Sequence, residues 1–184
     1  MTVADIRLET ERLVLRLPQA GEFERYAELM ADADACRYIG GHLARGAAWR
    51  KFLQMPGAWL LQGFAMFSVV EKSSGRWVGQ MGPWKPEGWP GNEIGYAFHP
   101  DAWGRGYAHE SAVAAIDWAF DTLGWDDIVH CIAPENLHSK RVAERLGSQL
   151  LRTGRLLPAP SETVDVELWG QSRAQWDAGR AARA

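Results

Sequence analysis

The sequence predicts a single α/β domain (α+β in some classification schemes) over residues 1–184. Three observations lead to this prediction. Short apolar or alternating runs typical of strands are interspersed with runs whose apolar residues have helical spacing. A glycine-rich turn joins a strand-like run at 93–99 to a long helical run at 106–123. The chain is long enough for one substantial core, and no repeat or low-complexity linker divides it.

Hydrophobic spacing and turn residues predict the elements in order. Residues 12–17 alternate and end at Pro18, which indicates a strand, and residues 83–92 are rich in Pro, Gly and Trp, which indicates a loop. The other predicted strands cover residues 59–71, 77–81, 93–99, 127–133, 148–157 and 162–170. The predicted helices cover residues 20–33, 44–55, 106–123 and 136–146, followed by a polar helical tail from Ser172.

Composition and charge limit the classes of function. Hydrophobic residues make up 47% of the chain and charged residues 23%, as in a soluble globular protein. A net charge of −3 provides no overall basic field to attract nucleic acid or an anionic membrane. The first residues lack the apolar core of a signal peptide, and no apolar run reaches membrane-spanning length. Cys36 and Cys131 lie too far apart for a metal or redox motif, so we expect reduced thiols in a cytoplasmic protein.

The turn Trp103-Gly104-Arg105-Gly106-Tyr107-Ala108 is the most informative local feature. It opens a helix, where unpaired backbone N–H groups and the helix dipole favour an anion. Glycines allow the backbone to approach that anion closely. The segment therefore predicts a phosphate site, against the alternative of a plain connection between strand and helix.

Three segments, of which this turn is one, together indicate a family. They are Glu93-Ile94-Gly95-Tyr96, residues 103–108, and Asn136-Leu137-His138-Ser139 continuing to Gly147. In these segments the chain resembles the GNAT superfamily of acyl-CoA-dependent N-acyltransferases, and most of all its RimJ/RimL-like branch. The resemblance implies the GNAT fold, with a mixed, mostly antiparallel sheet of about seven strands flanked by about four helices. It also implies acetyl-CoA as co-substrate and no metal.

The same resemblance implies positions for the coenzyme. Backbone amides of the turn would cradle the pyrophosphate, although Trp103 stands where the family has Arg or Gln. The strand at 93–99 would splay from the strand at 127–133, and the pantetheine arm would lie between them. The Phe98 N–H would polarise the thioester carbonyl, and Asn136 would bond the arm. The implied coenzyme ligands are Phe98, Gly104, Arg105, Gly106, Tyr107, Ala108, His109, Asn136 and Ser139.

Acyl transfer to an amine needs a neutral amine, a polarised carbonyl and a protonated leaving thiolate. Ser139 matches the family position near the sulfur, but a Ser hydroxyl is a poor acid and Tyr is commoner in the superfamily. Glu93, acting through water, is the first candidate base and His99 the second. The alternative for Glu93 is a solvated strand-end carboxylate, and for His99 a side chain that only satisfies backbone groups.

Other chemistry-bearing residues are expected to be structural. His109-Glu110 resembles the start of a zinc-protease motif, but Val113 stands where the second His would be, so no metal site is predicted. His130 and Cys131 are expected in the core, and Glu110 is expected to stabilise its helix locally.

Two classes of function remain open. The first is an N-acetyltransferase that transfers the acetyl group directly, and the second is a GNAT-like module that senses acyl-CoA without turnover. Glu93 and Ser139 favour the enzyme. A dinucleotide-binding protein is excluded because residue 109 is His where the Gly-x-Gly-x-x-Gly pattern needs Gly. The acceptor could be a protein N-terminus, aminoglycoside, polyamine or amino acid. Trp84 and Trp89 suggest an aromatic-walled acceptor site or, alternatively, a subunit contact in a possible homodimer.

Overall fold

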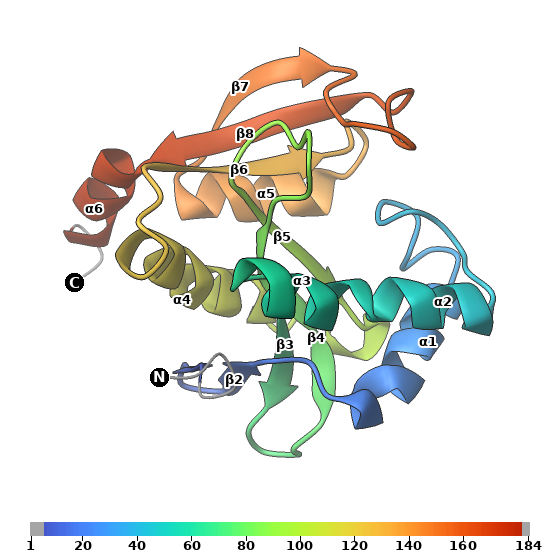
Figure 1. The fold of residues 1–184 in the computed structure, drawn as a ribbon. Helices are drawn as coiled ribbons and strands as arrows, with labels where there is room; N and C mark the ends of the chain where they lie inside the picture. Colours follow the sequence, from blue (N-terminus) through green and yellow to red (C-terminus); the bar gives the residue numbers. More distant parts are fainter. Residues whose placement is uncertain (1–5, 182–184) are drawn as a thin grey trace.

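The computed structural model describes residues 6–181, which form one eight-stranded sheet in the order β1-β2-β3-β4-β5-β6-β8-β7 (Figure 1). The strands are β1 (Arg7–Glu9), β2 (Leu13–Arg16), β3 (Phe67–Glu71), β4 (Trp77–Trp84), β5 (Glu93–Phe98), β6 (Asp127–Ile132), β7 (Gln149–Gly154) and β8 (Val166–Ser172). The helices are α1 (Phe23–Ala31), α2 (Arg45–Phe52), α3 (Gln54–Gln62), α4 (Tyr107–Asp121), α5 (Leu137–Leu146) and α6 (Arg173–Ala181), with short 3-10 turns at Ala20–Glu22 and Pro100–Ala102.

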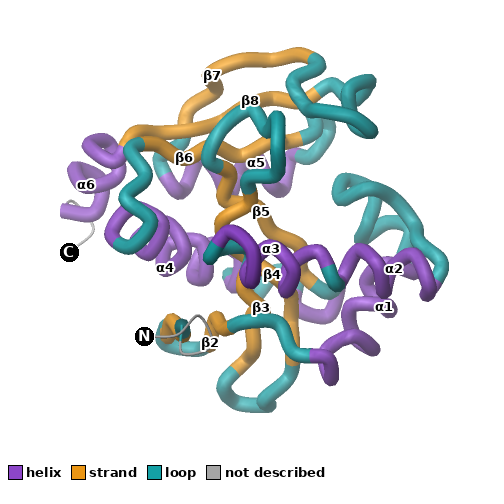
Figure 2. The backbone as a smooth tube through the Cα atoms, in the orientation of Figure 1, coloured by secondary structure: helices purple, strands orange, loops and turns teal. Residues whose placement is uncertain are grey.

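The helices cover both faces of the sheet (Figure 2). Successive residues of β5 show the two sides, because neighbouring side chains of a strand point to opposite faces. Ala97 shares a buried cluster with Tyr26 of α1 and Phe52 of α2. Phe98 belongs instead to the main core, which includes Ile116 of α4. The fold prediction is therefore confirmed, with eight strands among residues 6–181 where about seven were expected and six α-helices where about four were expected.

Strands β5 and β6 are the only parallel neighbours among the described strands, and all other pairs are antiparallel. Within residues 6–181 their register contains a single pair, Glu93 with Val129. Beyond that pair β5 runs away from the β6-β8-β7 part of the sheet (Figure 1). The two strands thus diverge toward the end of β5 that leads into the glycine turn.

The predicted strand over residues 59–71 is wrong in its first half. Trp59 lies in α3, where its ring packs on Phe67 at 5.0 Å between centroids and its indole N–H donates to the Met66 carbonyl. Gly63, at φ +80°, ends the helix, and β3 begins only at Phe67. A short continuous apolar run is compatible with a helix or a strand, so its period alone could not separate them.

The loop predicted at 83–92 begins two residues too early. Pro83 and Trp84 belong to β4, and Pro83 lies opposite Ile94 of β5. Antiparallel pairs alternate between hydrogen-bonded and non-bonded positions, and this pair is non-bonded, so the missing N–H of proline costs nothing there.

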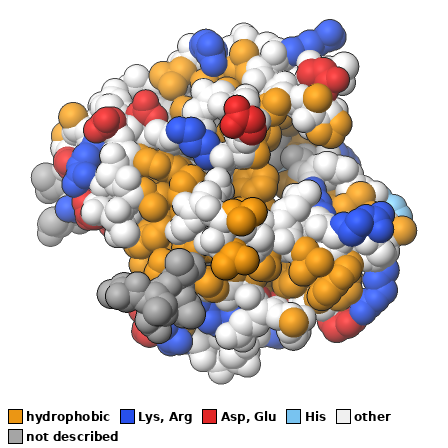
Figure 3. Space-filling view, in the orientation of Figure 1, with side chains coloured by type: hydrophobic (Ala, Val, Ile, Leu, Met, Phe, Trp, Pro, Cys, Tyr) orange, Lys and Arg blue, Asp and Glu red, His pale blue; other side chains and the backbone are white. Residues whose placement is uncertain are grey.

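The surface adds two observations. No helix among residues 6–181 is long and apolar enough to cross a membrane. Hydrophobic side chains gather over α2 and α3 on the face drawn in Figure 3, and the most exposed are Leu60 and Leu61, at 83% and 87%.

Candidate active site

The glycine turn has the backbone shape of an anion site. Gly104 and Gly106 have φ of +71° and +79°, a region that other residues adopt only with strain. Gly106 caps α4, and the first bond within that helix runs from the Glu110 N–H to the Gly106 carbonyl at 3.1 Å. The amides of Tyr107 and Ala108 come before this bond and have no acceptor in their own helix. A Cβ built on Gly104 would meet no atom of residues 6–181 within 4 Å, so the turn is open on that side.

The side chains of the turn are held against β3. The Arg105 guanidinium lies 2.6 Å from Glu71 Oε1, and the Tyr107 hydroxyl donates to the same oxygen at 2.5 Å. Hydrogen bonds from Ser74 and Tyr107, together with Arg105, lower the pKa of Glu71 to about 2. The side chains of Arg105 and Tyr107 therefore brace the turn, while their backbone amides remain at the start of α4.

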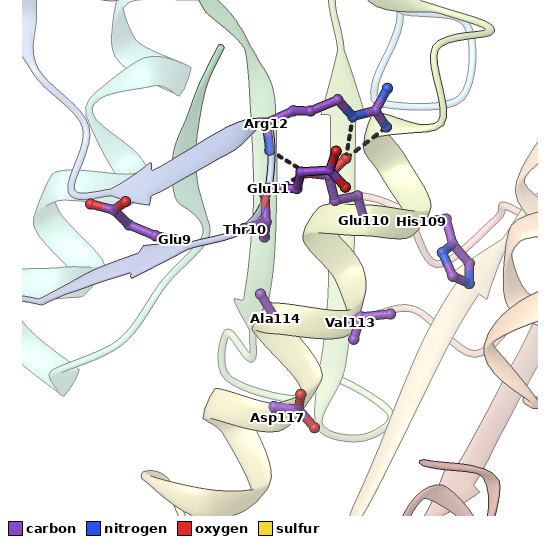
Figure 4. A pocket seen from close by; sticks show the side chains of 9 residues that line it. All are labelled: Glu9, Thr10, Glu11, Arg12, His109, Glu110, Val113, Ala114 and Asp117. Atoms are coloured by element: carbon purple, nitrogen blue, oxygen red, sulfur yellow. Dashed lines mark hydrogen bonds and ion pairs between the residues drawn. The ribbon is translucent and has the colours of Figure 1, made fainter. Parts of the chain in front are cut away.

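Glu110 anchors the first turn of α4 to the N-terminal strands (Figure 4). Its carboxylate accepts hydrogen bonds from the Thr10 hydroxyl at 2.5 Å, the Arg12 backbone N–H at 2.9 Å and the Arg12 Nε at 2.7 Å. The role of Glu110 is therefore wider than the local helix stabilisation expected from the sequence, because its partners lie about 100 positions away in the chain. A cavity of about 720 Å³ lies beside it. The carboxylates that line this cavity belong to Glu9, Glu11, Glu110 and Asp117, which makes it unsuitable for a phosphate.

Within residues 6–181, the edge of β5 that faces β6 continues past the single register pair of the two strands, Glu93 with Val129. The His99 N–H donates to the Val78 carbonyl at 2.9 Å, which places the polar groups of His99 toward β4. Because antiparallel pairing alternates, the N–H groups of Tyr96 and Phe98 point the other way, toward the diverging β6. The Phe98 carbonyl accepts from the Trp103 indole N–H at 2.9 Å. Trp103 thus braces the end of β5 at the position where the family has Arg or Gln.

Helix α5 brings Asn136 and Ser139 to this edge. Asn136 is the N-cap of α5, and its Oδ1 accepts the Ser139 N–H at 3.1 Å. The Tyr96 hydroxyl donates to Ser139 Oγ at 2.8 Å. Burial raises the pKa of Tyr96, which keeps the phenol protonated. Sequence reasoning missed Tyr96, although the commoner use of Tyr as the acid in this superfamily was a signal.

Glu93 lies on the opposite face of β5 and is 7% exposed, so the alternative of a solvated carboxylate is wrong. The Trp89 indole N–H donates to its Oε2, and the Cys131 backbone N–H donates to its Oε1 at 3.3 Å. Burial raises the pKa of Glu93 to about 7, although these two bonds act in the other direction. Trp84 pairs with Glu93 across the strands, and its ring meets Trp89 edge-on with centroids 6.5 Å apart.

The structure does not bring His99 to Glu93 or to the Tyr96–Ser139 pair. Its Nδ1 accepts the Asp101 N–H at 3.4 Å and caps the 3-10 turn, and its Nε2 lies 3.4 Å from Glu28 Oε2. At about 3.3 Å per strand residue, His99 is roughly 20 Å along β5 from Glu93. His99 thus accepts a backbone N–H and lies beside Glu28, as expected for a side chain with a structural role.

Among residues 6–181, no group of three or more His, Cys, Asp or Glu side chains could hold a metal ion. His130 is buried in the sheet, as expected, and Cys131 is half-buried beside Glu93.

Comparison with known proteins decides the family. Residues 12–149 match the family model described as "Acetyltransferase (GNAT) domain". The chain belongs to the GNAT acetyltransferase family. This GNAT protein is 30% identical over 155 residues to the uncharacterized protein YkkB of Bacillus subtilis (strain 168), covering 82% of this chain and 89% of YkkB.

Solved structures agree with this family. An acetyltransferase from Agrobacterium tumefaciens str. C58 has a TM-score of 0.78 and 31% identity, covering 91% of this GNAT protein and 95% of that chain. A ribosomal-protein-S5-alanine acetyltransferase from Vibrio fischeri has a TM-score of 0.69 and 18% identity, over 94% and 99% of the two chains, and shows likeness of fold alone. Membership of the family supports acyl transfer with acetyl-CoA as the donor.

Proposed function

We propose that this GNAT protein is an N-acetyltransferase that moves an acetyl group from acetyl-CoA directly to a primary amine. One arrangement carries the proposal. A buried carboxylate with a pKa of about 7, Glu93, lies on one face of β5, and the Tyr96–Ser139 pair lies on the other. Between them runs the strand edge whose N–H groups face the divergence from β6.

The coenzyme would bind along this edge. The pyrophosphate would take the turn amides from Gly104 to His109, and the pantetheine arm would add to β5 like a further strand. At about 3.3 Å per strand residue, Phe98 lies roughly 16 Å along β5 from Glu93, too far for the expected contact with the thioester carbonyl. The Tyr96 N–H, on the same edge and nearer to Glu93, would donate to that carbonyl, and the Phe98 N–H would donate to the pantetheine arm. Asn136 would donate through its amide nitrogen, since its oxygen already caps α5.

Each proton of the reaction has an acceptor or donor in this arrangement. Glu93 would take a proton from the amine through a water molecule, and the amine nitrogen would then attack the thioester carbon. The C–S bond breaks once the C–N bond has formed, and the departing thiolate receives a proton from Ser139, whose hydroxyl is replenished by Tyr96. The second proton, which the nitrogen loses on becoming an amide, would return to Tyr96 through solvent water. The products are an N-acetyl amide and free coenzyme A. Burial raises the pKa of the Cys131 thiol, which argues against a cysteine nucleophile and favours direct transfer.

The acceptor would enter on the Glu93 face, where Trp84 and Trp89 provide an aromatic wall. Such a wall suits a peptide N-terminus or a flat small-molecule amine. The proposal includes four further points. They are a protein N-terminus as acceptor, membership of the RimJ/RimL-like branch, a cytoplasmic location and a possible homodimer.

The experiment is a release assay for free thiol with the purified protein, acetyl-CoA and a panel of amines. The panel contains peptides with different N-terminal residues, a polyamine, an aminoglycoside and amino acids, and mass spectrometry identifies the product. We expect amine-dependent thiol release that is lost in Glu93→Gln at neutral pH. Tight binding of acetyl-CoA with no turnover for any amine would favour the sensor instead, and no binding would overturn both.

A further inference from the structure

The parallel ladder between β5 and β6 stops abruptly. The Val129 N–H donates to the Asn92 carbonyl at 2.9 Å, which is the first bond of a regular parallel pattern. Two residues further along β6, that pattern requires the Cys131 N–H to donate to the Ile94 carbonyl. This bond is replaced in the structure.

Two side chains satisfy the donor and the acceptor that the replaced bond would have joined. The Cys131 N–H donates to Glu93 Oε1 at 3.3 Å, and the Ile94 carbonyl lies 2.8 Å from His130 Nδ1. Because a carbonyl oxygen only accepts, the His130 proton must be on Nδ1, and Nε2 keeps its lone pair. The strands therefore part without leaving either backbone group unsatisfied.

A buried His130 costs folding free energy that an apolar residue at the same position would not. The residue is 4% exposed, and burial lowers its pKa, which keeps the imidazole neutral. Its Nε2 is buried and has no hydrogen-bond partner among residues 6–181. An apolar side chain of similar size would avoid this unpaired acceptor and pack equally well. The histidine thus supplies something that packing alone does not need.

We propose that His130 is a positioning residue that stops the β5–β6 ladder and so keeps the Tyr96 N–H available to the coenzyme arm. The inference rests on the proposed function, because an open strand edge serves a purpose only if the coenzyme arm binds there. Without the imidazole, the Ile94 carbonyl would accept the Cys131 N–H, and the next position of the ladder would pair the Tyr96 N–H with the Cys131 carbonyl. The strands would then close over the edge at which the arm is added.

Three variants of the full chain test this role. His130→Leu removes the donor while keeping an apolar side chain. His130→Asn keeps a donor, because the Asn amide nitrogen is the same number of bonds from Cα as Nδ1. Gln171→Leu is the matched control: Gln171 is a buried residue on neighbouring β8 whose amide also donates to a backbone carbonyl, that of Leu146 at 3.0 Å.

Two readouts separate positioning from stability. Calorimetric titration measures acetyl-CoA affinity, and NMR hydrogen exchange on the ligand-free protein measures protection of the Tyr96 amide. For His130→Leu we expect affinity to fall about 10-fold or more and exchange of the Tyr96 amide to slow, because that amide becomes paired. His130→Asn should stay within about threefold of wild type in both. Gln171→Leu should lower the melting temperature but change neither readout.

Wild-type affinity and rapid Tyr96 exchange in His130→Leu would overturn the proposal, as would an Asn variant that behaves like the Leu variant. If His130→Leu does not fold, His130→Ala against His130→Asn gives the same comparison. If the wild-type protein binds no acetyl-CoA, the proposed function is overturned, and so is the purpose proposed for interrupting the β5–β6 ladder. The exchange rates, measured without ligand, separately decide whether His130 interrupts the ladder.

Discussion

The hydroxyl of Tyr96 on β5 donates a hydrogen bond to Ser139 Oγ at the start of α5, with 2.8 Å between the oxygens. The two residues are 43 positions apart in the chain. Their contact gives the weakly acidic Ser139 a phenol from which it can regain a proton. This pair makes the proposed protonation of the leaving thiolate directly testable.

Ser139→Ala should lower turnover by roughly 10- to 1000-fold while acetyl-CoA affinity barely changes, because the hydroxyl acts on the departing sulfur. Tyr96→Phe should reduce turnover in the same range. Residues that act as one unit are not additive, so the double variant should be little slower than the slower single variant. Steady-state kinetics and calorimetry provide the measurements. Full turnover in Ser139→Ala would reduce the residue to its backbone role at the helix start.

Glu93→Gln should remove most of the activity at neutral pH and recover part of it at high pH, where the free amine is already deprotonated. In the wild type, kcat/KM should rise with pH through about 7, as Glu93 loses its proton, and this limb should vanish in the variant. His99→Gln serves as the comparison and should have the smaller effect. A normal profile in Glu93→Gln with a defect in His99→Gln would reverse the assignment of the base.

The buried Glu93 should also make stability depend on pH. Its folded pKa of about 7 lies above the ordinary value of 4.5, so the folded state favours the protonated form. The associated stabilisation is complete below the unfolded pKa and is lost as pH rises through about 7. Between pH 5 and 8 this loss amounts to roughly 2 kcal/mol or more. Urea unfolding should show Glu93→Gln gaining stability relative to wild type over that interval, and a constant difference would contradict burial of the carboxylate.

Gly106→Glu should abolish acetyl-CoA binding, because it places bulk and negative charge at the helix N-terminus expected to hold the pyrophosphate. The change also introduces strain, since φ is +79°. Gly124→Glu is the matched control: its φ is +69°, but it lies beyond the opposite end of α4. Calorimetry should find binding lost in the first variant and kept in the second. Unchanged affinity in Gly106→Glu would remove the coenzyme from this turn.

The sequence by itself determined the order of most elements, the family and the glycine turn. These features depend on neighbouring residues: alternation marks β2, helical spacing marks α4, and Gly104 and Gly106 supply the backbone freedom that an anion turn needs. It also selected Glu93 as a candidate base from its place in the strand. Where local patterns were ambiguous, as at Trp59 in α3, local reasoning failed.

Only the tertiary structure decided how these residues act together. Burial of Glu93 depends on Trp89 and on a strand 38 positions away, whose Cys131 amide it accepts. The contact of Tyr96 with Ser139 depends on how α5 packs on the sheet. His130 stops the ladder only because β6 lies parallel to β5 in one register. A pKa, a proton donor and a strand edge left open all depend on distances between segments far apart in the chain, which no local pattern contains.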